Sequence, residues 1–117
     1  MAKWRLKLQE ELPEVFKQVQ KDGWEFSQAH ALLCLREVYQ ESIKQRNTTL
    51  TKRIIQFSSW IIKEGREDMI SILAACFVEH IYDGLDREDI KYLRPLLKNS
   101  MLLTFSSTIP LCSYPEK

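Results

Sequence analysis

The chain has 117 residues, of which 44% are hydrophobic and 28% are charged, and its formal net charge is +1. This length predicts one domain with a core of its own. The low numbers of glycines, three, and prolines, four, argue against a turn-rich β-sandwich or barrel. The near-neutral charge argues against a protein that binds nucleic acid through the phosphate backbone, because such proteins carry a strong basic excess.

The sequence also predicts a cytoplasmic protein that does not enter a membrane. Residues 1–7 include three basic residues and no apolar core of signal-peptide length. No uncharged apolar stretch is long enough to cross a bilayer. The cysteines Cys34, Cys76 and Cys112 are odd in number and widely spaced, which is typical of free thiols in a reducing compartment.

Apolar residues at helical spacing predict about six helices. The first covers residues 2–12, where Trp4, Leu8 and Leu12 share one face. Pro13 fits the first turn of a second helix, which Gly23 is expected to end. The third helix, from about residue 26 to 46, is expected to be capped by Ser27. It should pack on several sides, because residues 29–35 are apolar nearly all round.

The remaining helices follow at short intervals. The fourth covers residues 50–64, with an apolar stripe at Leu50, Ile54, Phe57 and Ile61. The fifth is expected over residues 67–82. Asp86 should cap the sixth, which Pro95 is expected to break or kink at Arg94.

These elements predict a single all-α domain over residues 1–101. Short turns between consecutive helices favour a bundle or a stack of antiparallel helical hairpins. Residues 102–117 contain strand-like side chains and two prolines. We expect them to form an extended C-terminal tail that is partly packed.

Two pairs of side chains could carry chemistry. His30 and Cys34, and likewise Cys76 and His80, are four residues apart, so each pair should lie on one helix face. Two facing helices could close a Cys2His2 zinc site, or a cysteine could act as a nucleophile beside a histidine base. A core role is favoured over both, because no C-x-x-C pair is present and thiols in apolar runs are unreactive. We therefore predict no catalytic residue and no cofactor.

Charged residues gather at two places. Glu79, Asp83, Asp86 and Asp89 concentrate acid around a helix start, where carboxylates cap the backbone and favour the helix dipole. The alternative is an acidic patch that docks a basic protein partner. Basic residues surround another turn, at Lys44, Arg46, Lys52 and Arg53. The helix after that turn is rich in Ile and Phe rather than in base-reading polar side chains, so DNA binding is not predicted.

Trp60 lies off the apolar stripe of its helix. An aromatic side chain outside the core is a candidate anchor for a protein interface. The alternative is that another element, such as the C-terminal tail, covers it.

Residues 50–101 resemble a known kind of domain. An Ile/Phe/Trp helix ends in Lys-Glu-Gly at residues 63–65, and an Ile/Ala-rich helix ends in Phe-Val-Glu-His-Ile-Tyr at residues 77–82. A turn and the segment 90–97 follow. This order is similar to a family of small, uncharacterised, all-helical bacterial domains, some of which look like immunity proteins of contact-dependent or polymorphic toxin systems. The resemblance implies a cytosolic protein that neutralises a toxin by binding it, and it carries over no binding residues.

The leading prediction is a non-enzymatic protein-binding module that occludes a partner's active site. Its contact residues are predicted to be Glu79, Asp83, Asp86 and Asp89, with Trp60 as an anchor. Two other functions stay open. One is a homodimeric structural or regulatory protein, and the other is a zinc-binding protein that uses His30, Cys34, Cys76 and His80.

Overall fold

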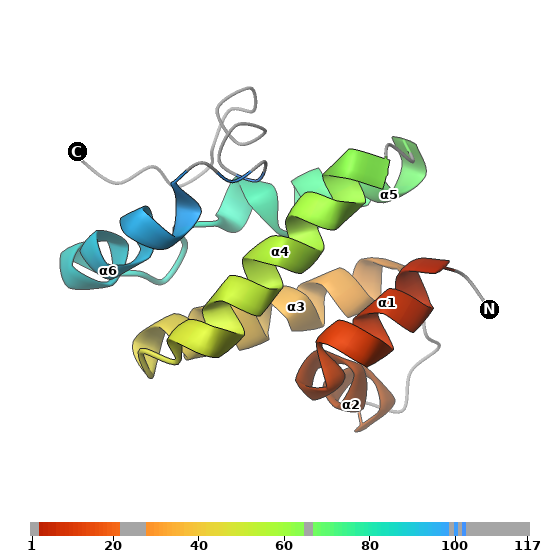
Figure 1. Ribbon diagram of the computed structural model, residues 1–117, viewed down its shortest axis with the longest axis horizontal. Helices are drawn as coiled ribbons and strands as arrows, with labels where there is room; N and C mark the ends of the chain where they lie inside the picture. The colour runs from red at the N-terminus through yellow and green to blue at the C-terminus, as the bar shows by residue number, and fades with distance from the viewer. Residues whose placement is uncertain (1–2, 22–27, 65–66, 99, 101, 103–117) are drawn as a thin grey trace.

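The described part of the chain is helical throughout (Figure 1). A computed structural model describes residues 3–21, 28–64, 67–98, 100 and 102. These residues form six α-helices and one short 3-10 helix, η1, which confirms the predicted all-α fold. In chain order they are α1 (Lys3–Glu11), α2 (Pro13–Lys21), α3 (Gln28–Lys44), α4 (Thr48–Glu64), α5 (Glu67–Cys76), η1 (Val78–His80) and α6 (Arg87–Leu97).

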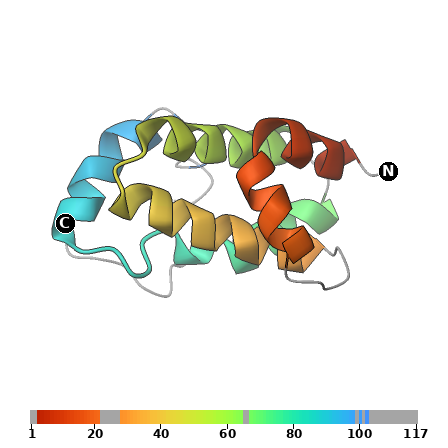
Figure 2. The ribbon, with the colours of Figure 1, turned by 90° about the horizontal axis from the view of Figure 1, so that it is seen from below.

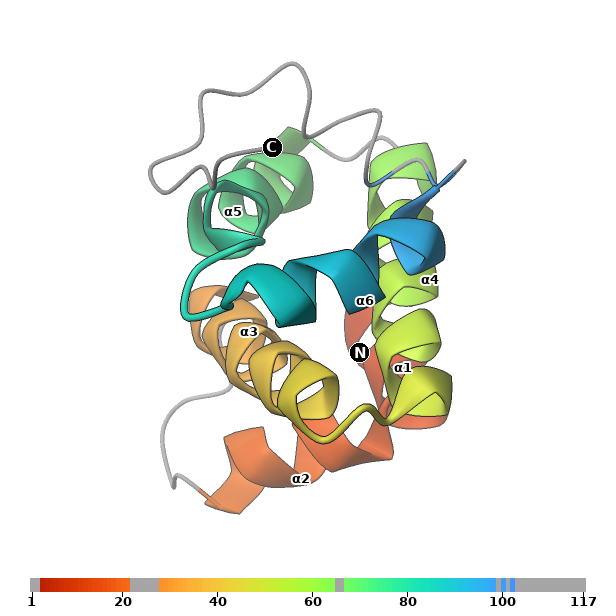
Figure 3. The same cartoon turned by 90° about the vertical axis from the view of Figure 1, so that its left-hand side faces the viewer.

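Helix α3 is the centre of the fold and packs against α2, α4, α5 and α6. Figure 2 shows α3 and α4 side by side, with α1 and α2 at one end of the pair and α6 at the other. Figure 3 shows α6 lying against both α3 and α4, and α5 beside α3. The buried side chains form one continuous hydrophobic cluster that draws on every helix.

The first two helices form as predicted. Trp4, Leu8 and Leu12 are all buried, because their spacing places them on one face. Pro13 begins α2. Its missing N–H costs nothing there, because an N–H at the first helical position has no partner within the helix. The predicted stop at Gly23 and the predicted cap at Ser27 lie outside the described residues.

The turn between α3 and α4 is tighter than predicted, because α4 begins at Thr48. Arg46 takes a left-handed backbone conformation with φ 56°, and the Asn47 side chain accepts a hydrogen bond from the Leu50 N–H at 3.3 Å. Helix α3 is not apolar on all sides in practice. Its Leu33 is 40% exposed, so one side of the helix faces solvent.

The prediction of one helix over residues 67–82 is wrong. Helix α5 ends at Cys76, and Phe77 leaves helical geometry with φ −129° and ψ −58° before η1 begins. This break allows Phe77, Val78 and Ile81 all to be buried. The Tyr39 hydroxyl donates a hydrogen bond of 3.0 Å to the Ile81 carbonyl, so this buried backbone acceptor is satisfied by a side chain from α3.

Helix α6 begins as predicted, since Asp86 and Asp89 form a reciprocal capping box. The predicted break at Arg94 is wrong, because the helix continues through Pro95 to Leu97. Pro95 is exposed and stands in the last turn, so its missing N–H costs a single hydrogen bond. Beyond α6, Leu102 is fully buried, whereas the predicted tail from residue 103 onward lies outside the described residues. None of the described helices is long and apolar enough to cross a membrane.

Candidate functional site

The structure places the four predicted acidic residues in different environments. Glu79 is half-buried in η1, and Asp83 forms a hydrogen bond with His80, with 2.6 Å between Oδ2 and Nδ1. Asp86 is exposed and caps α6. Asp89, in contrast, is only 3% exposed, so it is not available to a partner in this conformation.

Asp89 instead joins α6 to the turn between α3 and α4. Its carboxylate accepts hydrogen bonds from Lys44, from Arg46 at 2.7 Å and from the Asp86 backbone N–H at 3.1 Å. Burial alone would raise the pKa of Asp89, but the hydrogen bonds from Lys44 and Arg46 outweigh it and hold the pKa well below its usual range. The Arg46 guanidinium also lies 4.8 Å from the centre of the Tyr92 ring. These contacts give Asp89 a structural role.

The histidine and cysteine residues do not come together as a set. Cys34 is buried, with its Sγ 3.9 Å from Nε2 of His30. Cys76 ends α5, where burial raises the pKa of its thiol, whereas His80 lies beyond the break in η1. Among the described residues, no three His, Cys, Asp or Glu side chains are grouped closely enough to hold a metal ion.

The predicted basic cluster is also divided. Lys44 and Arg46 bind Asp89, and Arg53 forms an ion pair with Glu14 at 2.6 Å. Only Lys52 of the four has no ion pair with a described residue. It lines a groove instead.

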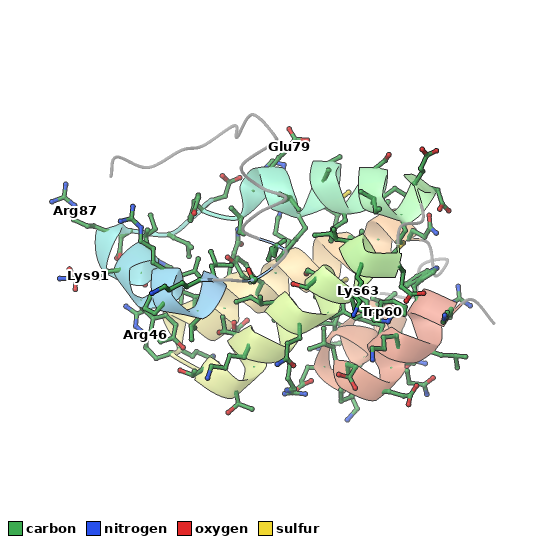
Figure 4. The ribbon with its side chains drawn as sticks, turned by 45° about the horizontal axis from the view of Figure 1, so that its top comes forward. Arg46, Trp60, Lys63, Glu79, Arg87 and Lys91 are labelled. Carbon is green, nitrogen blue, oxygen red and sulfur yellow. The ribbon has the colours of Figure 1, made fainter. Side chains whose placement is uncertain are left out.

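That groove is open to the surface, and Trp60 is part of its lining. It has a volume of about 620 Å³ and lies between α4 and the end of α6. We call it the Trp60 groove, and the described residues that line it are Lys52, Ile55, Gln56, Ser59, Trp60, Lys63, Leu96, Lys98 and Ser100. Figure 4 shows Trp60 and Lys63 next to each other on α4. The groove is large enough for several side chains of a bound partner.

Trp60 is held in place and is only partly covered. Its ring stacks on Phe57 with 6.1 Å between ring centres, and Lys7 of α1 places its Nζ 5.5 Å from the ring centre. Helix α1 thus covers part of the Trp60 side chain. The C-terminal tail, which was predicted as one element that could cover Trp60, lies outside the described residues from residue 103 onward. The side chain nevertheless stays half-exposed where it lines the groove.

A second surface feature was not predicted from the sequence. Arg87, Lys91 and Arg94 of α6 and Lys98, which directly follows the helix, are spaced by four, three and four residues, and all four are exposed. The opposite face of the helix is buried through Ile90, Leu93 and Leu97. We call these four residues the α6 basic stripe. Figure 4 shows Arg87 and Lys91 projecting away from the body of the protein.

Comparison with known proteins identifies a family but no activity. A family model described as a domain of unknown function, DUF7674, matches residues 5–107. This match covers more of the chain than the segment 50–101 on which the resemblance was based. No curated protein and no solved structure matches the sequence.

Proposed function

We propose that this chain, which belongs to the DUF7674 family, is a non-enzymatic module that binds a protein partner in the cytosol. The observation that carries the proposal is the Trp60 groove. A tryptophan fixed by Phe57 and Lys7, yet still open to a groove of about 620 Å³, has the character of a binding hot spot. Such residues are large, rigid and amphipathic, and they dominate many protein interfaces.

The groove is a better candidate surface than the acidic residues. Asp89 is buried and Asp83 is paired with His80, which leaves Glu79 and Asp86 as the acidic alternative. Neither of these belongs to the described lining of the Trp60 groove. In the mechanism that we propose, the partner inserts side chains beside Trp60, and the helical domain then blocks a functional surface of that partner.

The resemblance of residues 50–101 supports one specific form of this proposal, in which the partner is a toxin domain. Binding would neutralise the toxin by covering its active site. Co-expression tests this form, because a toxin partner should arrest growth alone and should lose that effect when this chain is present.

The general proposal is tested by capture of partners from the native cells with the tagged full-length chain. We expect Trp60→Ala to reduce recovery of a stoichiometric partner by about tenfold or more, as for a hot-spot residue. Because this substitution also removes packing on Phe57, a second variant, Ser59→Tyr, fills the groove without removing a core contact. Leu33→Ala is the matched control, since it truncates an exposed apolar side chain outside the groove.

Circular dichroism must first show that each variant is folded. Loss of the partner with both groove variants, and retention with Leu33→Ala, supports the proposal. Retention by both groove variants contradicts it. If only the double variant Glu79→Gln plus Asp86→Asn fails to capture the partner, the binding site would instead lie at the acidic residues. Asparagine is chosen at position 86 because it keeps the helix cap.

A further inference from the structure

We infer that the partner segment recognised by this domain is acidic, and that it carries an apolar anchor residue. This inference rests on the proposed function, because it names the chemistry of the partner at the same site. It starts from the α6 basic stripe, whose four cations form no ion pair with any described residue. Lys44, Arg46 and Arg53 do form such pairs, whereas Lys52 and Lys63 of the groove form none with a described residue. What distinguishes the stripe is that its four cations, unpaired among the described residues, follow one exposed face at helical spacing.

The helix itself does not require the first two residues of the stripe. Arg87 is the first helical residue after the cap Asp86, where the helix dipole favours a negative charge. Lys91 is exposed in the middle of the helix and is not one of its buried residues. Arg94 and Lys98, by contrast, stand at the end where the dipole favours a cation. Arg87 and Lys91 therefore have no role in the stability of α6 that explains their charge.

The stripe and the Trp60 groove form one surface, because Lys98 belongs to both. The groove adds Lys52 and Lys63, and its described lining contains no carboxylate. Its floor is apolar at Ile55, Trp60 and Leu96. A partner that satisfies this surface must supply negative charges for the lysines and an apolar side chain for the floor.

The dimensions fit an extended polypeptide. The 11 residues of α6, Arg87–Leu97, span about 16 Å, at about 1.5 Å per helical residue. A chain in extended conformation covers that length with about five residues. In a segment of about 12 residues, about five follow the stripe, and the other seven or so can extend about 20 Å further and place an anchor side chain in the groove.

Two other occupants fit the surface less well. Nucleic acid is disfavoured because the net charge of the chain is only +1, whereas proteins that bind the phosphate backbone carry a strong basic excess. A base stacking on Trp60 would also compete with Phe57 and Lys7 for the ring. A second copy joined through a twofold axis would bring the same lysines face to face.

The test uses the full-length chain and fluorescently labelled synthetic peptides of about 12 residues, a length set by the span of the surface. The peptides carry Asp and Glu around one central Leu, Phe or Trp. Peptides with Lys in place of the acids, single-stranded and duplex oligonucleotides, and phosphatidylserine vesicles serve as competing probes. Binding is measured by fluorescence anisotropy, by sedimentation for the vesicles, and at two salt concentrations.

We expect the acidic peptides to bind and the basic peptides not to bind, with affinity that falls as salt rises. Arg87→Glu plus Lys91→Glu should weaken this binding by about tenfold, because complementary charges become like charges. The double variant should fold, since glutamate suits the first turn of a helix. Lys17→Glu, on the exposed side of α2, is the matched control and should change the affinity less than about twofold.

Binding of oligonucleotides or vesicles in preference to acidic peptides would overturn the inference. An equal effect of Lys17→Glu, or no binding of any acidic peptide up to about 1 mM, the weakest range of specific association, would do the same. These results would not contradict the proposed function if the two groove variants, Trp60→Ala and Ser59→Tyr, fail to capture the partner. If acidic peptides bind but both groove variants still capture the partner, the result would support the inferred chemistry and contradict the proposed function.

Discussion

Asp89 offers the sharpest test of the physical account of the fold. It is 3% exposed and joins α6 to the turn between α3 and α4 through Lys44 and Arg46. Replacing it with asparagine keeps the size of the side chain and removes the negative charge. One amide oxygen can still accept the hydrogen bond from the Asp86 N–H, so Asp89→Asn isolates the charge from the capping box.

The expected loss of stability follows from the exposure of the two cations. Breaking a fully buried ion pair costs about 3–5 kcal/mol, because a charge is left without a partner. The Lys44 and Arg46 side chains are 48% and 42% exposed, so both regain water when Asp89 loses its charge. We assign about 1 kcal/mol to each contact, the upper end for exposed pairs, and expect Asp89→Asn to cost about 2 kcal/mol in total.

Urea unfolding followed by circular dichroism measures this loss, and thermal unfolding should show a melting temperature lower by about 6–8 °C. The matched control is Glu88→Gln, which removes an exposed carboxylate from the same helical turn and should change stability by less than about 0.5 kcal/mol. Asp89→Ala also removes the acceptor for the Asp86 N–H and should cost about 1 kcal/mol more.

The pH dependence gives an independent check. The pKa of Asp89 is lowered in the folded protein by its hydrogen bonds from Lys44 and Arg46, so its stabilising contribution is fully present above the unfolded pKa of about 3.9. The contribution is lost as the pH falls below that value toward the folded pKa. The difference between wild type and Asp89→Asn should therefore be constant near neutral pH and shrink in acid. A difference below about 0.5 kcal/mol at pH 7, or one that does not shrink in acid, would refute this reasoning.

Two further substitutions test the account of the chain reversals. Tyr39→Phe should lower the free energy of unfolding, measured in urea, by about 1–1.5 kcal/mol, because the buried Ile81 carbonyl loses its hydrogen bond. An unchanged free energy of unfolding would mean that this bond does not stabilise the segment after α5. Gly84→Ala should cost about 1–2 kcal/mol through backbone strain at φ +71°. A new Cβ there would lie 3.9 Å from Nε2 of Gln40, so it has room, and a neutral or stabilising result would contradict the strain argument.

Local patterns in the sequence predicted most of the helices. The stripe of Trp4, Leu8 and Leu12, the placement of Pro13 and the cap at Asp86 all depend on residues within a few positions of one another, and all are confirmed. The break after α5 was missed because the apolar period continues through residues 77–82. What favours the break is tertiary, since Tyr39 donates a hydrogen bond to Ile81 from 42 residues away.

The candidate site shows the same division between local and tertiary information. The α6 basic stripe could have been found from the spacing of its four residues, had the outward face of that helix been considered. The Trp60 groove could not, because it exists only where α4 and the end of α6 lie together. The burial of Asp89 was also beyond the sequence, since Lys44 lies 45 residues away from it in the chain.

Site-specific photo-crosslinking in the native cells tests the central claim, that the Trp60 groove is the partner-binding surface, most directly. A photoreactive amino acid at Gln56, an exposed residue that lines the groove, is compared with one at Gln20, which is exposed on α2. The account predicts that one protein is cross-linked from residue 56 and not from residue 20. Cross-linking of that protein from residue 20 alone, or equally from both positions, would contradict it.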